Sequence, residues 1–140
     1  MEKLAVRAVR GATTVEENNA EMILDATREL LERITVENDI AHEDIISIVF
    51  SMTCDLDAVF PAVAARQLGW TDIAMMCFNE INVPGSLEKC IRVMMHINTE
   101  KSNNEIRYVY LNDAVKLRPD LFEQSDNMGR AAIGKNKHSD

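Results

Sequence analysis

The stretch EKCIRVMMHINT, residues 88–99, decides the fold, because it alternates like a strand of a buried sheet and carries a charge at its centre. Its apolar residues at every second position fall on one face of such a strand: Ile91, Val93, Met95 and Ile97. Arg92 interrupts this apolar stretch. Because an unpaired buried charge is costly, the guanidinium needs a partner. That partner is either another side chain of the protein or an anion that the protein binds.

Segments on either side of this stretch predict further strands. Their ranges are 4–11, 44–52, 72–83 and 106–111, and the central stretch itself forms a strand over 90–98. Alternation of apolar and polar residues marks the first of them, and β-branched residues mark the second. Pro84 and Gly85 predict a turn just before the central strand.

Two helices are predicted between these strands. Thr13 and Thr14 are each followed by a glutamate three residues later, which is the pattern of a capping box, so the first helix is expected to begin near them. Apolar residues at helical spacing continue this helix until Asn38 and Asp39. The second helix is expected to begin at Pro61, since proline suits a first helical turn, and to end at Gly69.

The order β-α-β-α-β-β-β predicts an α/β or α+β domain with a mixed sheet and two main helices. The length is that of one domain, which we expect to span residues 1–121. Residues 122–140 are polar and nearly free of large apolar side chains, so they predict a flexible C-terminal tail. Neither a dinucleotide-binding loop nor a P-loop occurs in the sequence.

The charge of the chain argues against nucleic acid as a partner. The 140 residues carry a net charge of −8, and residues 14–44 hold ten acids against two arginines, which leaves room for a cationic pocket elsewhere. No segment approaches the roughly 20 apolar residues of a membrane span, and no signal-peptide pattern opens the chain, so we expect a soluble, cytoplasmic protein. Three cysteines without a C-x-x-C pair predict neither a disulfide framework nor a zinc site.

The candidate site residues are four arginines and three other side chains. They are Arg10, Arg66, Arg92 and Arg118, with Cys77, Glu80 and Tyr110. Each has a plain structural interpretation as well, either a surface charge or core packing, and for Arg92 this alternative is an ion pair with Glu80. In a regular strand Cys77 and Glu80 face opposite ways, so a bulge or strand end near Asn79 is needed to bring both to one site.

Four longer segments add a resemblance. They are VRGATTVEEN (9–18), DLDAVFPAVAARQLGW (55–70), CFNEINVPGSLEKCIRVMMH (77–96) and VYLNDAVKLRPDL (109–121). Together, and in this order, they resemble the monofunctional chorismate mutases of the AroH class, and the resemblance runs from about residue 4 to 121. It implies an isomerase that converts chorismate to prephenate on the pathway to phenylalanine and tyrosine. It also implies a homotrimer with a barrel-like core and active sites between subunits, without a cofactor or a metal.

The resemblance further implies roles for individual residues. The catalytic residues are Arg92, Arg10 and Glu80. The substrate-binding residues are Tyr110, Cys77, Phe60, Ala62, Arg66, Leu117 and Arg118. The chain departs from the family pattern at Ala74, where a proline is common, and at Tyr108, where a histidine is common, and neither position belongs to these sets.

The implied reaction suits a sequence without a catalytic triad or a metal cluster. A concerted [3,3] rearrangement moves no proton and needs no nucleophile. It needs a cation beside the ether oxygen on which negative charge develops, and Arg92 is the candidate. Two alternatives stay open at this point: a trimeric carboxylate-binding protein without turnover, related in fold to imine deaminases, and a purely structural Arg92–Glu80 pair.

Overall fold

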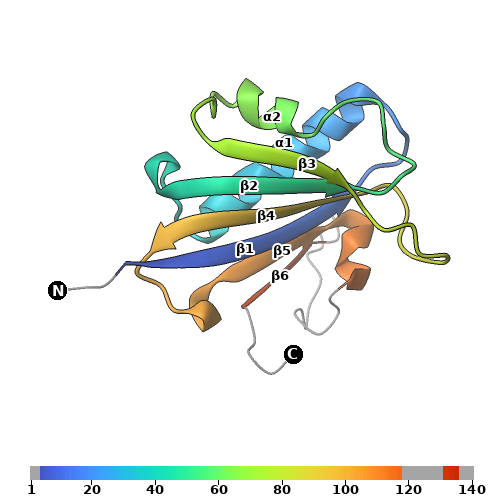
Figure 1. Cartoon of the computed structure of the whole chain (residues 1–140). Helices are drawn as coiled ribbons and strands as arrows, with labels where there is room; N and C mark the ends of the chain where they lie inside the picture. Colours follow the sequence, from blue (N-terminus) through green and yellow to red (C-terminus); the bar gives the residue numbers. More distant parts are fainter. Residues whose placement is uncertain (1–3, 118–130, 136–140) are drawn as a thin grey trace.

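The computed structural model describes residues 4–117 and, as backbone only, residues 131–135. Its strands are β1 (Ala5–Thr14), β2 (Ile45–Met52), β3 (Ala74–Asn79), β4 (Cys90–Thr99), β5 (Arg107–Leu111) and β6 (Ala131–Lys135) (Figure 1). Its helices are α1 (Ala20–Glu37) and α2 (Ala62–Gln67), and three short 3₁₀ turns are η1 (His42–Asp44), η2 (Asn103–Glu105) and η3 (Asn112–Leu117). None of the helices in these residues is long and apolar enough to cross a membrane.

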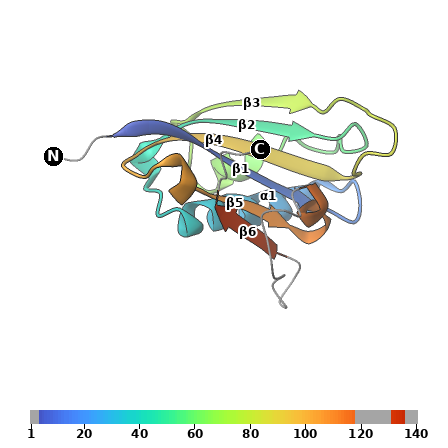
Figure 2. The ribbon, with the colours of Figure 1, turned by 90° about the horizontal axis from the view of Figure 1, so that it is seen from below.

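The strands form one mixed sheet in the order β3-β2-β4-β1-β5-β6. β4 pairs antiparallel with β1 on one side and with β2 on the other. β3 adds to β2 in parallel, β5 adds to β1 in parallel, and β6 pairs antiparallel with β5. Figure 2 shows β3 and β6 at the two edges of the sheet. The predicted α+β fold with a mixed sheet and two main helices is confirmed, and residues 88–99 supply one of its central strands.

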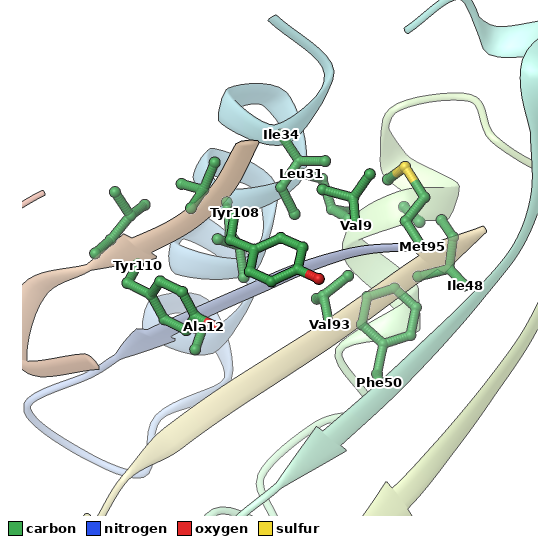
Figure 3. Packing of buried hydrophobic residues seen from close by; sticks show 14 of the residues in the cluster. Val9, Ala12, Leu31, Ile34, Ile48, Phe50, Val93, Met95, Tyr108 and Tyr110 are labelled. Carbon is green, nitrogen blue, oxygen red and sulfur yellow. The ribbon is translucent and has the colours of Figure 1, made fainter. Parts of the chain in front are cut away.

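Both helices lie on one side of the sheet, which we call the covered face (Figure 1). The apolar residues of β4 point to this face and are buried: Ile91, Val93, Met95 and Ile97. Val93, Met95 and Ile97 join buried residues of α1, β1, β2 and β5 in one large cluster (Figure 3), and Ile91 joins a smaller cluster with Ile23, Met52 and Leu56. By the alternation of side chains along a strand, Arg92 therefore points to the opposite side, which we call the open face.

The first helix packs directly on the backbone of β1. A Cβ atom added to Gly11 would lie 2.7 Å from Ile34 Cδ1 and 3.1 Å from Leu30 Cδ1. A side chain at this position would force Ile34 and Leu30 to shift, so glycine favours this close approach of α1 to β1. The glycine was expected to end the first strand, but β1 continues past it to Thr14.

The prediction that the first helix begins near Thr13 and Thr14 is wrong. Both threonines are buried at the end of β1, and their hydroxyl oxygens accept hydrogen bonds from the Asn112 side chain and from the Asp113 backbone N–H, both at 3.1 Å. They hold η3 against β1, a tertiary use that the local pattern could not reveal. The helix begins at Ala20 instead, capped by Asn19, whose side-chain oxygen accepts a hydrogen bond from the Met22 N–H at 3.0 Å.

The third strand is shorter than the predicted range 72–83. It ends at Asn79, and residues 81–88 form a loop in which Gly85 has a positive φ of 82°. A sixth strand, β6, lies within the segment predicted as a tail. The other residues of that segment, 122–130 and 136–140, lie outside the described residues.

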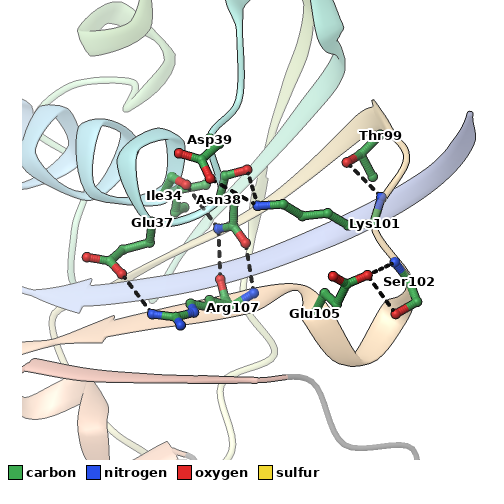
Figure 4. A network of polar contacts seen from close by, with 9 residues as sticks. All are labelled: Ile34, Glu37, Asn38, Asp39, Thr99, Lys101, Ser102, Glu105 and Arg107. Carbon is green, nitrogen blue, oxygen red and sulfur yellow. Dashed lines mark hydrogen bonds and ion pairs between the residues drawn. The ribbon is translucent and has the colours of Figure 1, made fainter. Parts of the chain in front are cut away.

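The end of α1 is tied to the start of β5 by one buried side chain, that of Asn38. Its amide nitrogen donates to Ile34 O at 3.0 Å and to Arg107 O at 2.9 Å, and its amide oxygen accepts from the Arg107 N–H at 2.8 Å. The Lys101 ammonium donates to Asn38 O at 2.9 Å (Figure 4). The prediction that the helix ends at Asn38 is confirmed, since α1 stops at Glu37.

Candidate active site

The strand register brings Arg92 and Tyr110 into one row across the open face. Arg92 pairs with Ser51 of β2 and with Ala12 of β1, and Ala12 pairs with Tyr110 of β5. Paired residues of neighbouring strands project to the same side of the sheet. Ser51 and Ala12 are small, so they leave space on both sides of the Arg92 stem. Tyr110 is 1% exposed and belongs to the core cluster, so its ring has a packing role in addition to any contact by its hydroxyl.

Among the described residues Arg92 has one acidic partner, Glu80. The distance between Arg92 Nε and Glu80 Oε2 is 3.5 Å, and the two side chains are 32% and 23% exposed. At this distance they form an ion pair, while the buried Nε makes no hydrogen bond within the described part of the chain. A guanidinium carries five N–H donors, and one carboxylate oxygen near Nε leaves most of these donors unoccupied. The structural pair therefore exists, and it leaves Arg92 with capacity to bind an anion.

Arg10 lies next to Arg92 on the open face. It pairs with Met94, two residues along β4 from Arg92, so the two arginines are diagonal neighbours, with Cβ atoms about 7–8 Å apart by the usual sheet geometry. Arg10 is half-buried, and its side chain makes no hydrogen bond or ion pair with any residue among 4–117. We call Arg10, Glu80, Arg92 and Tyr110 the sheet group. It presents two cations and one acid on a single face.

The remaining predicted residues from the middle of the chain lie elsewhere, near α2 and the edge strand β3. We call them the edge group: Phe60, Ala62, Arg66 and Cys77. Cys77 pairs with Phe50, so it points to the covered face and packs against the core, away from Arg92. Phe60 and Arg66 are exposed, and Ala62 is buried. The predicted strand end at Asn79 is present, but within one chain it does not bring Cys77 and Glu80 to the same side.

The last two predicted residues follow β5. Leu117, at the end of η3, is partly buried against the core and lines a depression with Thr14, Leu87, Lys89 and Lys116. Thr14 lies two residues beyond Ala12 on β1, so this depression opens beside the sheet group. Arg118 lies outside the described residues.

Cys90 lies two residues before Arg92, on the same face, and is fully buried. Burial raises the pKa of its thiol from 9.0 to about 11, although the Arg92 guanidinium acts in the opposite direction. The thiol is therefore neutral near pH 7, and this excludes Cys90 as an activated nucleophile.

Two residues of this region were missed by sequence reasoning, Ser51 and Ala12. Ser51 donates a hydrogen bond to Glu80 Oε2, and Ala12 separates Arg92 from Tyr110. The signal for Ser51 was a polar residue within the apolar run 44–52, which a tertiary partner across the sheet explains. For Ala12 no local signal distinguishes it from any other small strand residue.

The fold and these residues define a class: an α+β protein whose mixed sheet carries two neighbouring arginines on its open face. Within that class, the family model for chorismate mutase type I matches residues 6–121, and the chain belongs to this family. Family membership assigns it the chorismate mutase activity, which is an isomerisation.

Known relatives agree with this assignment. Chorismate mutase AroH of Bacillus subtilis (strain 168) is 49% identical over 119 residues, which are 84% of this chain and 94% of the relative. Chorismate mutase AroH of Thermus thermophilus is 46% identical over 117 residues, 83% of this chain and 96% of the relative. The solved structure of a chorismate mutase from Clostridium thermocellum is 58% identical and superposes with a TM-score of 0.76, covering 77% of this chain and 96% of that one.

Proposed function

We propose that the sheet group is the catalytic half of the active site and that it binds chorismate as a dianion. The observation that carries this proposal is the pair of diagonal arginines, Arg10 and Arg92, with Glu80 as the only acid in contact with either among the described residues. Two like charges held next to each other repel, and a ligand with two carboxylates removes that repulsion. The substrate class follows from the family.

The reaction on this site is a concerted [3,3] rearrangement to prephenate. The C–O bond of the enolpyruvyl ether breaks while a C–C bond forms, and negative charge builds on the ether oxygen. Arg92 donates to this oxygen, and because its charge is permanent and fixed in a strand, it stabilises the transition state more than the ground state. No covalent intermediate is formed.

The other members of the sheet group orient the substrate. Arg10 binds a carboxylate beside Arg92, and the Tyr110 hydroxyl donates to the side-chain carboxylate. Glu80 accepts a hydrogen bond from the ring hydroxyl, and its negative charge favours the positive charge that develops on the ring. These contacts hold the enolpyruvyl arm over the ring, a conformation that free chorismate rarely adopts.

The site is completed by a second copy of the chain in a homotrimer. Cys77 and Phe60 lie away from the sheet group of their own chain, so they serve it only if the edge group of one subunit faces the sheet group of the next. The support for this is a set of exposed apolar side chains on the open face, Met76, Phe78 and Met94, and the edge strand β3, which among the described strands pairs with β2 alone.

The domain boundary belongs to the same proposal. Residues 1–121 supply every residue of the proposed site, and residues 122–140, which include the edge strand β6, are dispensable for turnover. Leu117 contacts the substrate at the mouth of the site, and Arg118, which lies outside the described residues, is assigned a substrate contact by the family resemblance alone. Phe60 and Ala62 supply an apolar wall, with Arg66 at the rim.

The test of this assignment is Arg92→Ala, with chorismate turnover followed by the loss of its ultraviolet absorbance and prephenate confirmed as the product. Loss of one donor to developing charge costs about 10²–10³ in rate, so kcat should fall by at least that factor while the protein stays folded. Arg107→Ala is the matched control, because Arg107 is an exposed arginine of β5 paired with Glu37. Near-normal kcat in Arg92→Ala, or chorismate binding without prephenate in the unmodified protein, would reject the proposal.

A further inference from the structure

The Glu80 carboxylate is held by two groups that share one of its oxygens. Ser51 Oγ donates a hydrogen bond to Glu80 Oε2, and Arg92 Nε lies 3.5 Å from the same atom. The three residues come from three neighbouring strands, since Glu80 follows β3 directly and the sheet order is β3-β2-β4. Ser51 is the middle member.

The backbone places these side chains on the open face together. Ser51 pairs with Phe78 on one side and with Arg92 on the other. Glu80 is two residues beyond Phe78, and its N–H donates to Met52 O at 2.9 Å, so it stays attached to β2 after the strand has ended. Its side chain therefore projects to the same face as Ser51.

Glu80 can reach Arg92 only by crossing over β2. Neighbouring strands lie about 4.8 Å apart, so the strands that carry Glu80 and Arg92 are separated by roughly 10 Å. A serine at the crossing point leaves room for the carboxylate, and its hydroxyl supplies a donor there. A carboxylate that meets a guanidinium without such a restraint favours the bidentate fork, in which two N–H groups are occupied.

We propose that Ser51 is a positioning residue for the rearrangement. It holds Glu80 Oε2 at ion-pair distance from Arg92 Nε, prevents the carboxylate from closing the fork, and so keeps the Arg92 donors available to the substrate. This inference rests on the proposed function, because it assigns Arg92 and Glu80 to the site. The fold alone does not imply this role, because a serine in a central strand could simply be a small side chain that leaves room for Glu80.

The test compares four variants of the full chain by kcat, KM and melting temperature. Ser51→Ala removes the hydroxyl and should lower kcat about tenfold, the usual effect of one lost hydrogen bond to a charged group. Ser51→Thr keeps the hydroxyl, so its kcat should stay within about threefold of that of the unmodified enzyme. Ser51→Val has the shape of the threonine variant without the hydroxyl, so its kcat should be as low as that of Ser51→Ala. Ser47→Ala is the control, because Ser47 lies on the same strand and face but bonds His96 at 3.3 Å.

A double-mutant cycle separates positioning from packing. When Glu80→Ala has already removed the carboxylate, Ser51→Ala should cause no further loss of kcat. Equal losses in both backgrounds, or Thr and Val variants with the same kcat, would overturn the positioning role while leaving the proposed function intact. Normal kcat in both Arg92→Ala and Glu80→Ala would instead overturn the proposed function itself. The Thr and Val variants keep the test decisive if Ser51→Ala fails to fold.

Discussion

At the scale of the residue, the charge in the middle of an apolar stretch has a physical account. Arg92 is not buried among the residues that surround it in the sequence, because alternation along β4 sends its neighbours to the covered face and its guanidinium to the open face. There it meets one carboxylate at 3.5 Å and keeps a third of its surface exposed. The two interpretations of the charge, a protein partner and a bound anion, are therefore compatible, because pairing with Glu80 leaves part of the guanidinium able to bind an anion.

Cys90 leads to a prediction about alkaline pH. Its thiol has a pKa of about 11 in the folded protein against 9.0 ordinarily, mainly because burial disfavours the thiolate. Between these two values the unfolded chain loses this proton and the folded chain keeps it, so the thiol's contribution to stability is present below pH 9 and is lost as pH rises to 11.

The expected loss between pH 8 and pH 11 is about 2 kcal/mol, since one pKa unit corresponds to about 1.4 kcal/mol and at pH 11 the folded thiol is itself half ionised. Urea unfolding gives the free energy of unfolding of the protein and of Cys90→Ala at pH 8 and at pH 11. The loss is the change, between the two pH values, in the difference between these two free energies. A gap of the same size at both pH values would contradict the shift. Other groups that titrate in this range affect both proteins alike and cancel.

At the scale of the element, the C-terminal half of α1 is held by contacts distant in sequence. Gly11 lets Leu30 and Ile34 of the helix approach β1, and just after the helix Asn38 bonds the first residue of β5. These contacts set the position of β1 relative to β5, and with it the row that contains Arg92, Ala12 and Tyr110.

Asn38→Ala should therefore destabilise the protein. The change removes three side-chain hydrogen bonds and leaves the N–H and C=O of Arg107 without them. The expected cost is about 3 kcal/mol, from unsatisfied buried groups at about 1–3 kcal/mol each. Chemical denaturation measures it, with Asn82→Ala in the exposed loop as the control. A loss below about 0.5 kcal/mol, the range of ordinary surface changes, would show that water replaces these bonds.

At the scale of the whole molecule, the two groups of predicted residues lie on different parts of one chain. The proposed trimer brings them together, and subunit mixing tests it. Arg92→Ala disables the sheet group, and Phe60→Asp disables the edge group by placing a negative charge where the dianion binds. Phe60 is 69% exposed, so this substitution leaves the core untouched.

Each variant alone should be nearly inactive. After joint refolding of equal amounts, about one quarter of the sites combine an intact sheet group with an intact edge group, so activity should recover to about a quarter of the normal value. Chorismate turnover before and after mixing is the measurement. No recovery, in a mixture shown by light scattering to contain trimers, would mean that each site lies within one chain.

Much of the fold follows from local pattern, because β4 and α1 keep one apolar face over ten or more residues. The sequence prediction was wrong where a pattern is short or is compatible with two structures. Thr13 and Thr14 match a helix cap but bond η3 across the chain, and the run 72–83 looks like one strand although pairing with β2 stops at Asn79. The resemblance supplied the site residues as one set. It did not show that they divide between the sheet group and the edge group.

By itself, the sequence determined the α+β class, the buried strand within residues 88–99 and the identity of the charged side chains, since periodicity and residue type are local properties. Only the tertiary structure decided that Arg10 and Arg92 are diagonal neighbours, that Ser51 holds Glu80, and that Cys77 faces away from them. The reason is physical: strand order and register arise from packing between distant segments, and a side chain's partners across a sheet are not encoded in its neighbours along the chain.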